Sequence, residues 1–401
     1  MLDSLANLTT RRKWMGATAL AGGALAATVG GVELLRFRRT AADEDPFQGG
    51  KLVGNLMFED EGRAPLDTLL GDELDGRRFT DLGRLDGDNL ETPTDLFYVR
   101  TRASHLLDAS RPWSIQVASP AGDTRVTVRR VSISELRSQA EPQGLHLLEC
   151  AGNTRTAHFG LISVAAWDGV PLSGWLDRMR FDKDAGILVS GFDQYAAKPL
   201  TPSVPGASWI FSRRDIEDSG AFLATSMNGE PLTPDHGAPV RLVVPGWYGC
   251  ACIKWVNMIG PVDEAAEPTS QMQEYAARTH QRGLPARASE YQPATIDPAA
   301  MPVRIEKWLV AGKVKFKVIG IVWGGLQPAD NLQIRFRPEE PYVPVSRVQP
   351  AANSPWGLWT HVWAPRQPGV YRIRLRLADP SIRTRRLDTG FYVRQVEIDR
   401  I

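Results

Sequence analysis

Short apolar runs separated by polar loops fill residues 47–258 and predict a mixed, mostly β unit. Apolar and polar side chains alternate over residues 113–117 and again over 125–128, as they do in half-buried strands. Residues 131–138 predict the end of a strand followed by the start of a helix, with Ser134 as its N-cap. This part of the chain therefore predicts many strands and few, short helices.

Two short, mostly apolar runs, residues 145–148 and 240–244, predict strands buried in a core. The first run ends on Glu149 and Cys150, and the second is stopped by Pro245. Active sites often lie where a strand gives way to a loop, because the strand holds the side chains at its end in place. Polar residues at the ends of these two strands are therefore candidates for a functional site.

The pattern changes after residue 260. Residues 261–300 are polar and poor in apolar side chains, which predicts a connector that wraps the surface. From Met301 onward, strand-like runs recur at short intervals over residues 313–321, 333–336, 359–363, 370–377 and 389–396. About 100 residues with this spacing predict an immunoglobulin-like β-sandwich. Its core and interface are expected to hold Trp308, Trp323, Trp356, Trp359 and Trp363.

Length and composition agree with two folded units. A chain of 401 residues is too long for one ordinary core. The 36 glycines and 29 prolines favour many turns and argue against a helical bundle. A formal net charge of +1 gives no overall attraction to nucleic acid or to an anionic membrane. An anion would therefore have to bind at a local cluster of Arg and Lys.

The first residues of the chain predict export. The pair Arg11 and Arg12 precedes an aromatic residue and a run rich in Ala and Gly up to Val32, which is typical of a twin-arginine signal. A membrane-spanning helix is the alternative, but the run is short and is closed by Glu33. We therefore expect a periplasmic protein, or one retained at the membrane if the signal stays uncleaved. Because this route carries folded proteins, it also favours a cofactor inserted before export.

The sequence contains three cysteines, Cys150, Cys250 and Cys252. This odd, small number does not suit a disulfide scaffold, and a bridge between Cys250 and Cys252 would close a very tight ring. Cys150 is followed by small residues and by Arg155, whose charge favours a thiolate. A thiolate is a suitable soft ligand for a transition metal. A buried structural cysteine is the alternative.

Arg241 and Lys254 flank the second core strand and a turn bounded by glycines, an arrangement that can hold a phosphate or another anion. Solvated charges at the strand ends are the alternative. Four motifs occur in order here: CAGNTR from Cys150, AAWDGVPL from Ala165, MNGEPLTPDHGAPVR from Met227 and VPGWYGCACIKW from Val244. In order and spacing they resemble the sulfite oxidase family of molybdopterin enzymes, over roughly residues 90–260.

The resemblance implies a molybdenum–molybdopterin cofactor with Cys150 as the protein ligand to the metal. Arg155 takes the position of the arginine that lies beside the oxyanion substrate in this family. Arg100, at the end of the segment DLFYVR, resembles a second oxyanion arginine, and Trp167 resembles the tryptophan that lines the pocket. Planar guanidinium groups suit a tetrahedral oxyanion because they combine charge with directed donors.

Further residues of the motifs are expected to hold the cofactor. Arg241 and Lys254 fall where the family holds the pterin and its phosphate, and Asn153 belongs to the cysteine motif. Arg102 stands where the family has a pterin-contacting histidine. His236, in the segment DHG, is assigned to the same group, with a structural hydrogen bond in the turn as the alternative.

Two more departures from the family pattern concern the substrate. Thr225 stands two residues before MNG, where the family usually has a tyrosine, and Cys250 and Cys252 occupy the turn before Lys254. Loss of the tyrosine would change proton transfer at the metal or the size of the pocket. The resemblance therefore predicts the scaffold and cofactor more firmly than the substrate.

The predicted organisation is α+β, mostly β, with a sulfite-oxidase-type molybdopterin domain followed by an immunoglobulin-like sandwich. The predicted segments are a signal and linker over 1–45, a catalytic domain over 46–260, a connector over 261–300 and a dimerisation sandwich over 301–401. We expect sulfite or a similar oxyanion to be oxidised. A separate acceptor such as a c-type cytochrome is expected, because the sequence has no CxxCH haem motif. The alternatives are a reductase of an S-oxide or N-oxide and an exported binding protein without a metal.

Overall fold

A computed structural model describes residues 45–59, 61–87, 90–105, 107–108, 110, 112–121, 125–192, 207–325, 331–349 and 354–399. The predicted export signal lies outside the described residues. The chain divides into a small unit, Met1–Leu52 with Trp308–Lys313, and a large unit, Val53–Lys307 with Val314–Ile401. The large unit contains the sheets of both predicted folded parts, so the domain boundaries drawn from the sequence stay predictions.

The first sheet of the large unit carries the cysteine motif. Its strand order is β11-β10-β7-β6, and β12 pairs with β10. The strands are β6 (Glu141–Glu149), β7 (Ile162–Pro171), β10 (Phe222–Met227), β11 (Glu230–Pro231) and β12 (Arg241–Val243). Both predicted core strands thus lie in one sheet. Strands β7 and β10 are buried along almost their whole length.

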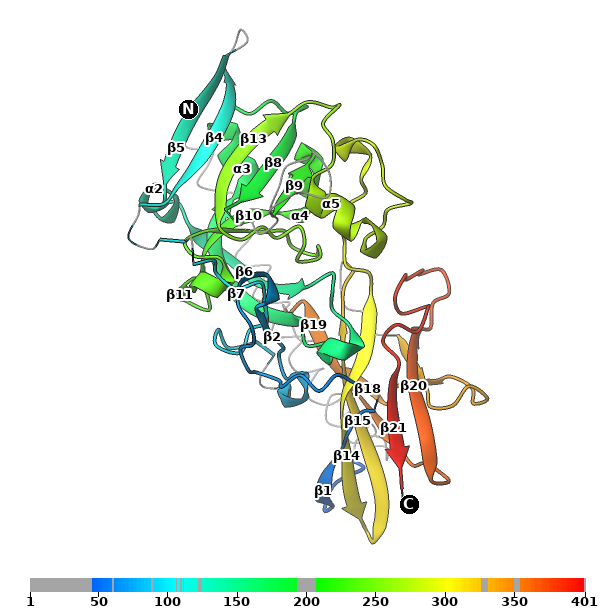
Figure 1. Cartoon of the computed structure of the whole chain (residues 1–401). Helices are drawn as coiled ribbons and strands as arrows, with labels where there is room; N and C mark the ends of the chain where they lie inside the picture. Colours follow the sequence, from blue (N-terminus) through cyan, green and yellow to red (C-terminus); the bar gives the residue numbers. More distant parts are fainter. Residues whose placement is uncertain are drawn as a thin grey trace, which may run out of the picture. The chain divides into compact units, whose positions relative to one another are not determined.

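The second sheet has the order β5-β4-β13-β8-β9, with β13 parallel to β4 and the other neighbours antiparallel (Figure 1). The strands are β4 (Ser114–Ala121), β5 (Arg125–Ser132), β8 (Gly186–Gly191), β9 (Ser208–Phe211) and β13 (Val256–Val262). The alternating segments at residues 113–117 and 125–128 are confirmed as strands, β4 and β5. They form an edge hairpin, which is consistent with their half-polar pattern.

The described helices of this part are short: α2 (Ile133–Arg137), α3 (Leu172–Arg178), α4 (Arg213–Ser219) and α5 (Ser270–Tyr275). The N-cap predicted for the first of them was wrong. Ser132, not Ser134, has extended backbone and accepts a hydrogen bond from the N–H of Glu135 at 3.1 Å. Strand β5 runs up to Ser132, so the helix begins directly where the strand ends.

The C-terminal residues form the predicted sandwich of two antiparallel sheets. One sheet has the order β14-β15-β19-β18, with β1 (Lys51–Leu56) at its edge, and the other has the order β17-β16-β20-β21. The strands are β14 (Ala299–Val310), β15 (Lys313–Trp323), β16 (Leu332–Arg335), β17 (Val343–Pro344), β18 (Arg347–Gln349), β19 (Trp356–Trp363), β20 (Gly369–Leu377) and β21 (Arg394–Ile398). The fold class is confirmed, although the last strand begins later than predicted because residues 386–393 form turns.

Two short strands, β2 (Arg77–Arg78) and β3 (Val99–Arg100), form a separate ribbon in which Arg77 pairs with Arg100. The predicted connector is partly ordered, since α5 is followed by the 3-10 helices Ala276–Arg278 and Ala288–Glu290. Remaining 3-10 helices are Glu73–Asp75, Leu82–Arg84, Arg155–Ala157 and Pro234–His236.

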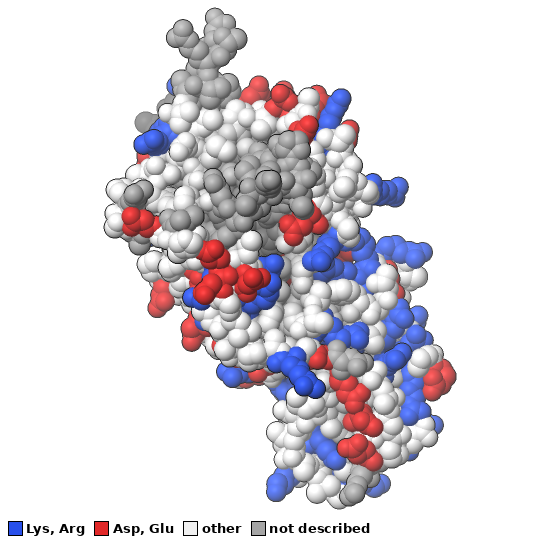
Figure 2. Space-filling model, viewed as in Figure 1, with Lys and Arg blue, Asp and Glu red and all other residues white. Residues whose placement is uncertain are grey.

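Charge of both signs is interspersed over the face shown in Figure 2, in keeping with the net charge near zero. Across the described residues, no helix is long and apolar enough to cross a membrane.

Candidate molybdopterin site

Cys150 follows the last residue of β6 and begins a tight loop. Its N–H donates to the carbonyl of Leu161 at 2.9 Å, and its carbonyl accepts from the N–H of Asn153 at 2.9 Å. The amide oxygen of Asn153 accepts from the N–H of Leu161 at 3.1 Å, and its nitrogen donates to Glu149 at 3.4 Å. Asn153 is fully buried, so both ends of its amide hold the loop itself. Asn153 was predicted to bind the cofactor, and in the structure its hydrogen bonds stabilise the cysteine loop.

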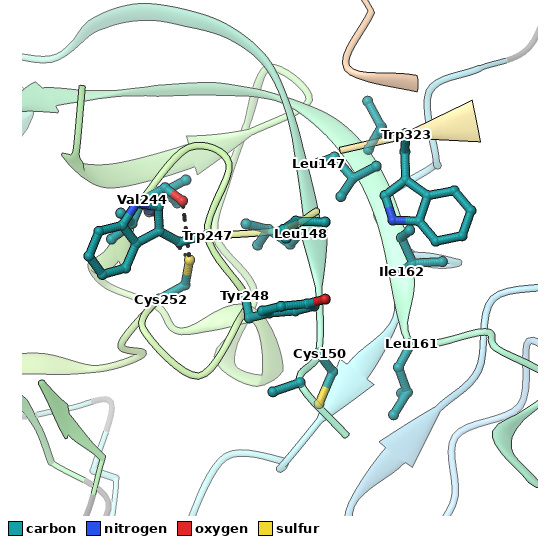
Figure 3. Packing of buried hydrophobic residues seen from close by; sticks show 14 of the residues in the cluster. Leu147, Leu148, Cys150, Leu161, Ile162, Val244, Trp247, Tyr248, Cys252 and Trp323 are labelled. Atoms are coloured by element: carbon teal, nitrogen blue, oxygen red, sulfur yellow. Dashed lines mark hydrogen bonds between the residues drawn. The ribbon is translucent and has the colours of Figure 1, made fainter. Parts of the chain in front are cut away.

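The Cys150 side chain is 7% exposed, and its Sγ accepts from the N–H of Gly152 at 3.3 Å. Figure 3 shows it at the end of the strand, below the ring of Tyr248. Burial raises the pKa of the thiol, and the hydrogen bond from Gly152 and the charges of Arg100 and Arg278 oppose that rise. In the protein alone, burial outweighs these opposing contributions, and the expectation that Arg155 favours the thiolate stays a prediction.

Arg155 is directed elsewhere. Its Nη2 donates to the carbonyl of Val393, in the turn before β21, at 2.9 Å. The charge of Arg100, by contrast, opposes the rise in the thiol pKa, and its Nη1 donates to the carbonyl of Leu74 at 2.6 Å. Arg77, paired with Arg100 across the ribbon, has its pKa lowered by burial and by the charge of Arg100. The two predicted oxyanion arginines therefore have different surroundings: Arg155 is bound to the turn before β21, and Arg100 contributes its charge to the surroundings of Cys150.

Tyr275 and Arg278 belong to the segment that sequence reasoning treated as a connector. A methyl group placed on Gly152 would lie 3.1 Å from Nη1 of Arg278 and 3.6 Å from Sγ of Cys150, so the guanidinium and the thiol are close neighbours. Burial and the nearby Cys150 raise the pKa of Tyr275, which keeps its hydroxyl protonated. No motif in the sequence marks these two residues, because only the tertiary fold brings α5 to the cysteine.

Lys254 ties three backbone segments together. Its Nζ donates to the carbonyls of Arg100 at 3.1 Å, of Asp235 at 2.9 Å, and of Thr101. Arg102 donates from Nε to the carboxylate of Asp235 at 3.3 Å and from Nη1 to that of Asp72 at 2.6 Å. Lys254 and Arg102, both predicted to hold the cofactor, thus hold the turn at Thr101 in place. Both also bind Asp235, which was not predicted as a site residue.

His236, Arg241 and Trp167 are buried together, and Phe97 packs edge-on against both the His236 and Trp167 rings. The guanidinium carbon of Arg241 lies 5.5 Å from the centre of the Trp167 ring. His236 contacts the hydroxyl of Thr233 through Nδ1 at 2.8 Å and the carbonyl of Phe97 through Nε2 at 3.4 Å. Burial, with the charges of Lys254 and Arg241, lowers the pKa of His236 to about 3. His236 is therefore neutral and already bonded within the protein.

Three buried donors in this region lack a hydrogen-bond partner: Nε of Arg78, Nε1 of Trp167 and Nε of Arg241. Buried donors are seldom left unpaired, so this set fits a ligand rich in acceptors, such as a pterin and its phosphate. No group of three or more His, Cys, Asp or Glu that could hold a metal ion exists among the described residues. The unpaired donors and the soft thiol of Cys150 fit a molybdenum ion that is held together with a pterin cofactor.

Thr225, Cys250 and Cys252, at which the sequence departs from the family pattern, are all buried. Thr225 is buried in β10, and its carbonyl accepts from the N–H of Leu232 at 3.4 Å. Cys250 and Cys252 are free and buried, and burial raises the pKa of both thiols. Sγ of Cys252 lies 3.9 Å from the carbonyl of Val244, as Figure 3 shows. Cys252 therefore points to β12 and its turn.

Comparison with known proteins agrees with this chemistry. Residues 104–269 match the family model of the oxidoreductase molybdopterin binding domain. The chain is 29% identical over 207 residues to mitochondrial sulfite oxidase of Macaca fascicularis, covering 47% of this chain and 36% of that one. It is 32% identical over 187 residues to nitrate reductase [NADH] 1 of Arabidopsis thaliana, covering 42% and 20%. The matched segments thus span about a third or less of these two relatives.

A solved structure shares the fold. The crystal structure of the sulfane dehydrogenase SoxCD from Paracoccus pantotrophus superposes with a TM-score of 0.59 at 17% identity, covering 80% of each chain. Fold, domain match and a buried cysteine among unpaired donors define a molybdopterin-dependent oxidoreductase. Within that class, the chain is similar to sulfite oxidases over about 200 residues.

Proposed function

We propose that this chain is a periplasmic enzyme that oxidises sulfite or a similar oxyanion and passes the electrons to a separate acceptor, such as a c-type cytochrome. The observation that carries the substrate class is the positive group beside Cys150, formed by Arg100 and Arg278. Similarity to sulfite oxidases over about 200 residues supports the same assignment. Periplasmic location is proposed from the paired arginines of the first residues.

The molybdenum cofactor, when bound, supplies the two-electron oxygen-transfer chemistry. Cys150 would hold the metal, and the unpaired donors of Arg78, Trp167 and Arg241 would hold the pterin and its phosphate. Buried positions make each of these donors effective, because water does not compete for the ligand there.

The substrate would be oriented by the residues around the thiol. Arg100 and Arg278 offer charge and directed donors to the oxygens of an anion. Tyr275 keeps its proton and can donate one hydrogen bond to a negatively charged oxygen. This tyrosine reaches the site from α5, whereas the usual position two residues before MNG holds Thr225. We propose that Tyr275 takes over the hydrogen-bonding role of the missing tyrosine.

The first test is molybdenum content and the visible spectrum of the purified protein, with Cys150→Ser beside the wild type. We expect about one metal per chain in the wild type, a thiolate-to-metal absorption band, and bleaching of that band by sulfite. The band should be lost in Cys150→Ser. Cys252→Ser is the matched control, because Cys252 is equally buried and hydrogen-bonds near Val244, and its band should be unchanged.

Two outcomes would change the assignment. A metal-loaded enzyme that ignores sulfite but reduces a sulfoxide or an N-oxide with a reduced dye would make the protein a reductase, an alternative favoured by the departure at Thr225. Absence of molybdenum from protein made with its maturation machinery would contradict the proposal as a whole.

A further inference from the structure

The residue before Cys150 is a carboxylate enclosed in the core. Glu149 is fully buried at the end of β6. One carboxylate oxygen accepts from Nε1 of Trp323 at 2.9 Å, and the other accepts from the hydroxyl of Tyr392 at 3.3 Å. Asn153 adds a third donor, at 3.4 Å, from the cysteine loop itself. Burying a carboxyl group is unfavourable unless it is hydrogen-bonded, so these donors determine where its oxygens can lie.

A fourth partner joins the same group. Arg386 places Nη1 3.6 Å from the carboxylate of Glu149 and donates from Nη2 to the carbonyl of Ala151 at 2.9 Å. Its guanidinium carbon also lies 4.7 Å from the centre of the Tyr248 ring. Arg386 therefore contacts the residue before Cys150 and the residue after it, with one side chain.

These partners have a common origin in the chain. Trp323 ends β15 of the sandwich, while Arg386 and Tyr392 lie in the turns between β20 and β21. Figure 3 shows the indole of Trp323 beside Ile162, at the end of β6 and β7. Arg155, five residues after Cys150, is held by the same turns through the carbonyl of Val393. The C-terminal sandwich thus holds the cysteine loop on both sides of the thiol.

From this geometry we infer that the sandwich is part of the catalytic centre: through Trp323, Tyr392 and Arg386 it fixes Glu149, and Glu149 fixes the direction of the Cys150 thiol. Glu149 is a positioning residue, since its carboxylate oxygens are taken up by Trp323, Tyr392 and Asn153. The inference rests on the proposed role of Cys150 as metal ligand. Groups that orient a metal ligand from the next layer commonly change activity about 10- to 100-fold when they are removed.

Two matched pairs of variants test the inference. Trp323→Phe removes the indole donor to Glu149, and its control Trp359→Phe removes an equally buried indole that donates to Ile321 within the sandwich at 3.0 Å. Tyr392→Phe removes the hydroxyl donor, and its control Tyr371→Phe removes a buried hydroxyl that donates to Gln367 at 2.6 Å. Each pair loses the same chemical group from the same sandwich, so general loss of stability affects both members.

In the metal-loaded enzyme we expect both test variants to shift the thiolate-to-metal band and to lower kcat about 10- to 100-fold with little change in KM. In cofactor-free protein, alkylation of Cys150 by iodoacetamide, followed by peptide mass spectrometry, should become several-fold faster in the test variants. The controls should match the wild type in band position, kcat and labelling rate, whatever their melting temperature.

The labelling rate needs no metal, whereas band position and kcat do, so together these measurements separate this inference from the proposed function. Test variants that label Cys150 at the wild-type rate, with band and kcat unchanged, would overturn it, as would controls that change as much as their partners. If no metal binds the wild type, the proposed function fails, and the labelling experiment still decides whether the sandwich positions the thiol.

Discussion

Arg278 is exposed on the short helix after α5, and its guanidinium has no hydrogen-bond or ion-pair partner in the described part of the chain. Arg155 and Arg102, in contrast, are bound to protein carbonyls and carboxylates. A guanidinium beside the thiol that makes no hydrogen bond to the protein is available to an incoming anion. A guanidinium that is hydrogen-bonded to the protein must first break those bonds. At the level of single residues, Arg278 is therefore the stronger candidate for contact with the substrate.

Replacing Arg278 with Gln should raise KM for sulfite about tenfold or more, because a charge-assisted hydrogen bond contributes about 1.5–3 kcal/mol. Arg282→Gln removes an exposed arginine four residues further along the chain and should leave KM unchanged. Steady-state kinetics of the metal-loaded enzyme measure both. Equal KM values for the two variants would exclude Arg278 from the anion site.

At the level of elements, the ribbon of β2 and β3 ends in a strained turn. Thr101 follows Arg100 with a φ of 73°, in the left-handed region, which is unfavourable for a β-branched residue. The carbonyls on both sides of this turn accept from Nζ of Lys254, which holds the strained backbone in place. Asn tolerates the left-handed conformation better than a β-branched residue does.

Thr101→Asn should therefore raise the free energy of unfolding by about 1 kcal/mol, through relief of backbone strain. Thr101→Val keeps the β-branched shape and loses only the hydroxyl, so it should give no stabilisation. Urea unfolding of the two variants beside the wild type checks this. A stabilising Thr101→Val would show that the hydroxyl, and not the backbone angle, is unfavourable.

At the level of the whole molecule, histidines with a lowered pKa make stability depend on pH. His236 has its pKa lowered to about 3, and His361 in the sandwich has its pKa lowered by burial to about 4. An unfolded histidine has a pKa of about 6.5 and takes up a proton first as the pH falls. The contribution of these groups is therefore fully present above about pH 6.5 and is lost progressively as the pH falls toward 3.

For His236 alone the loss amounts to roughly 2 kcal/mol at pH 5, at about 1.4 kcal/mol per pH unit below 6.5. His236→Gln can keep contacts to Thr233 and Phe97 without a titrating group. Its unfolding free energy should fall less between pH 7 and pH 5 than that of the wild type. His105→Gln, which changes an exposed histidine, is the control. A parallel fall in the wild type and His236→Gln would contradict the argument.

Much of the fold could be predicted from local pattern. The alternating segments of β4 and β5, the apolar runs of β6 and β12, and the tryptophan-rich sandwich follow from side-chain periodicity alone. The N-cap of α2 could not, because both Ser132 and Ser134 satisfy the local pattern and only the end of β5 decides between them. Local signals determine what an element is, and its neighbours determine where it begins.

By itself, the sequence determined the chemistry: four ordered motifs, a cysteine at a strand end and a family that binds molybdopterin. The tertiary structure decided which side chains meet that cysteine. It directed Arg155 to Val393, brought Arg278 and Tyr275 from the connector, and turned Trp323 from a core residue into a donor to Glu149. These contacts join residues more than a hundred positions apart, and no local spacing encodes them, because packing in three dimensions selects the partners.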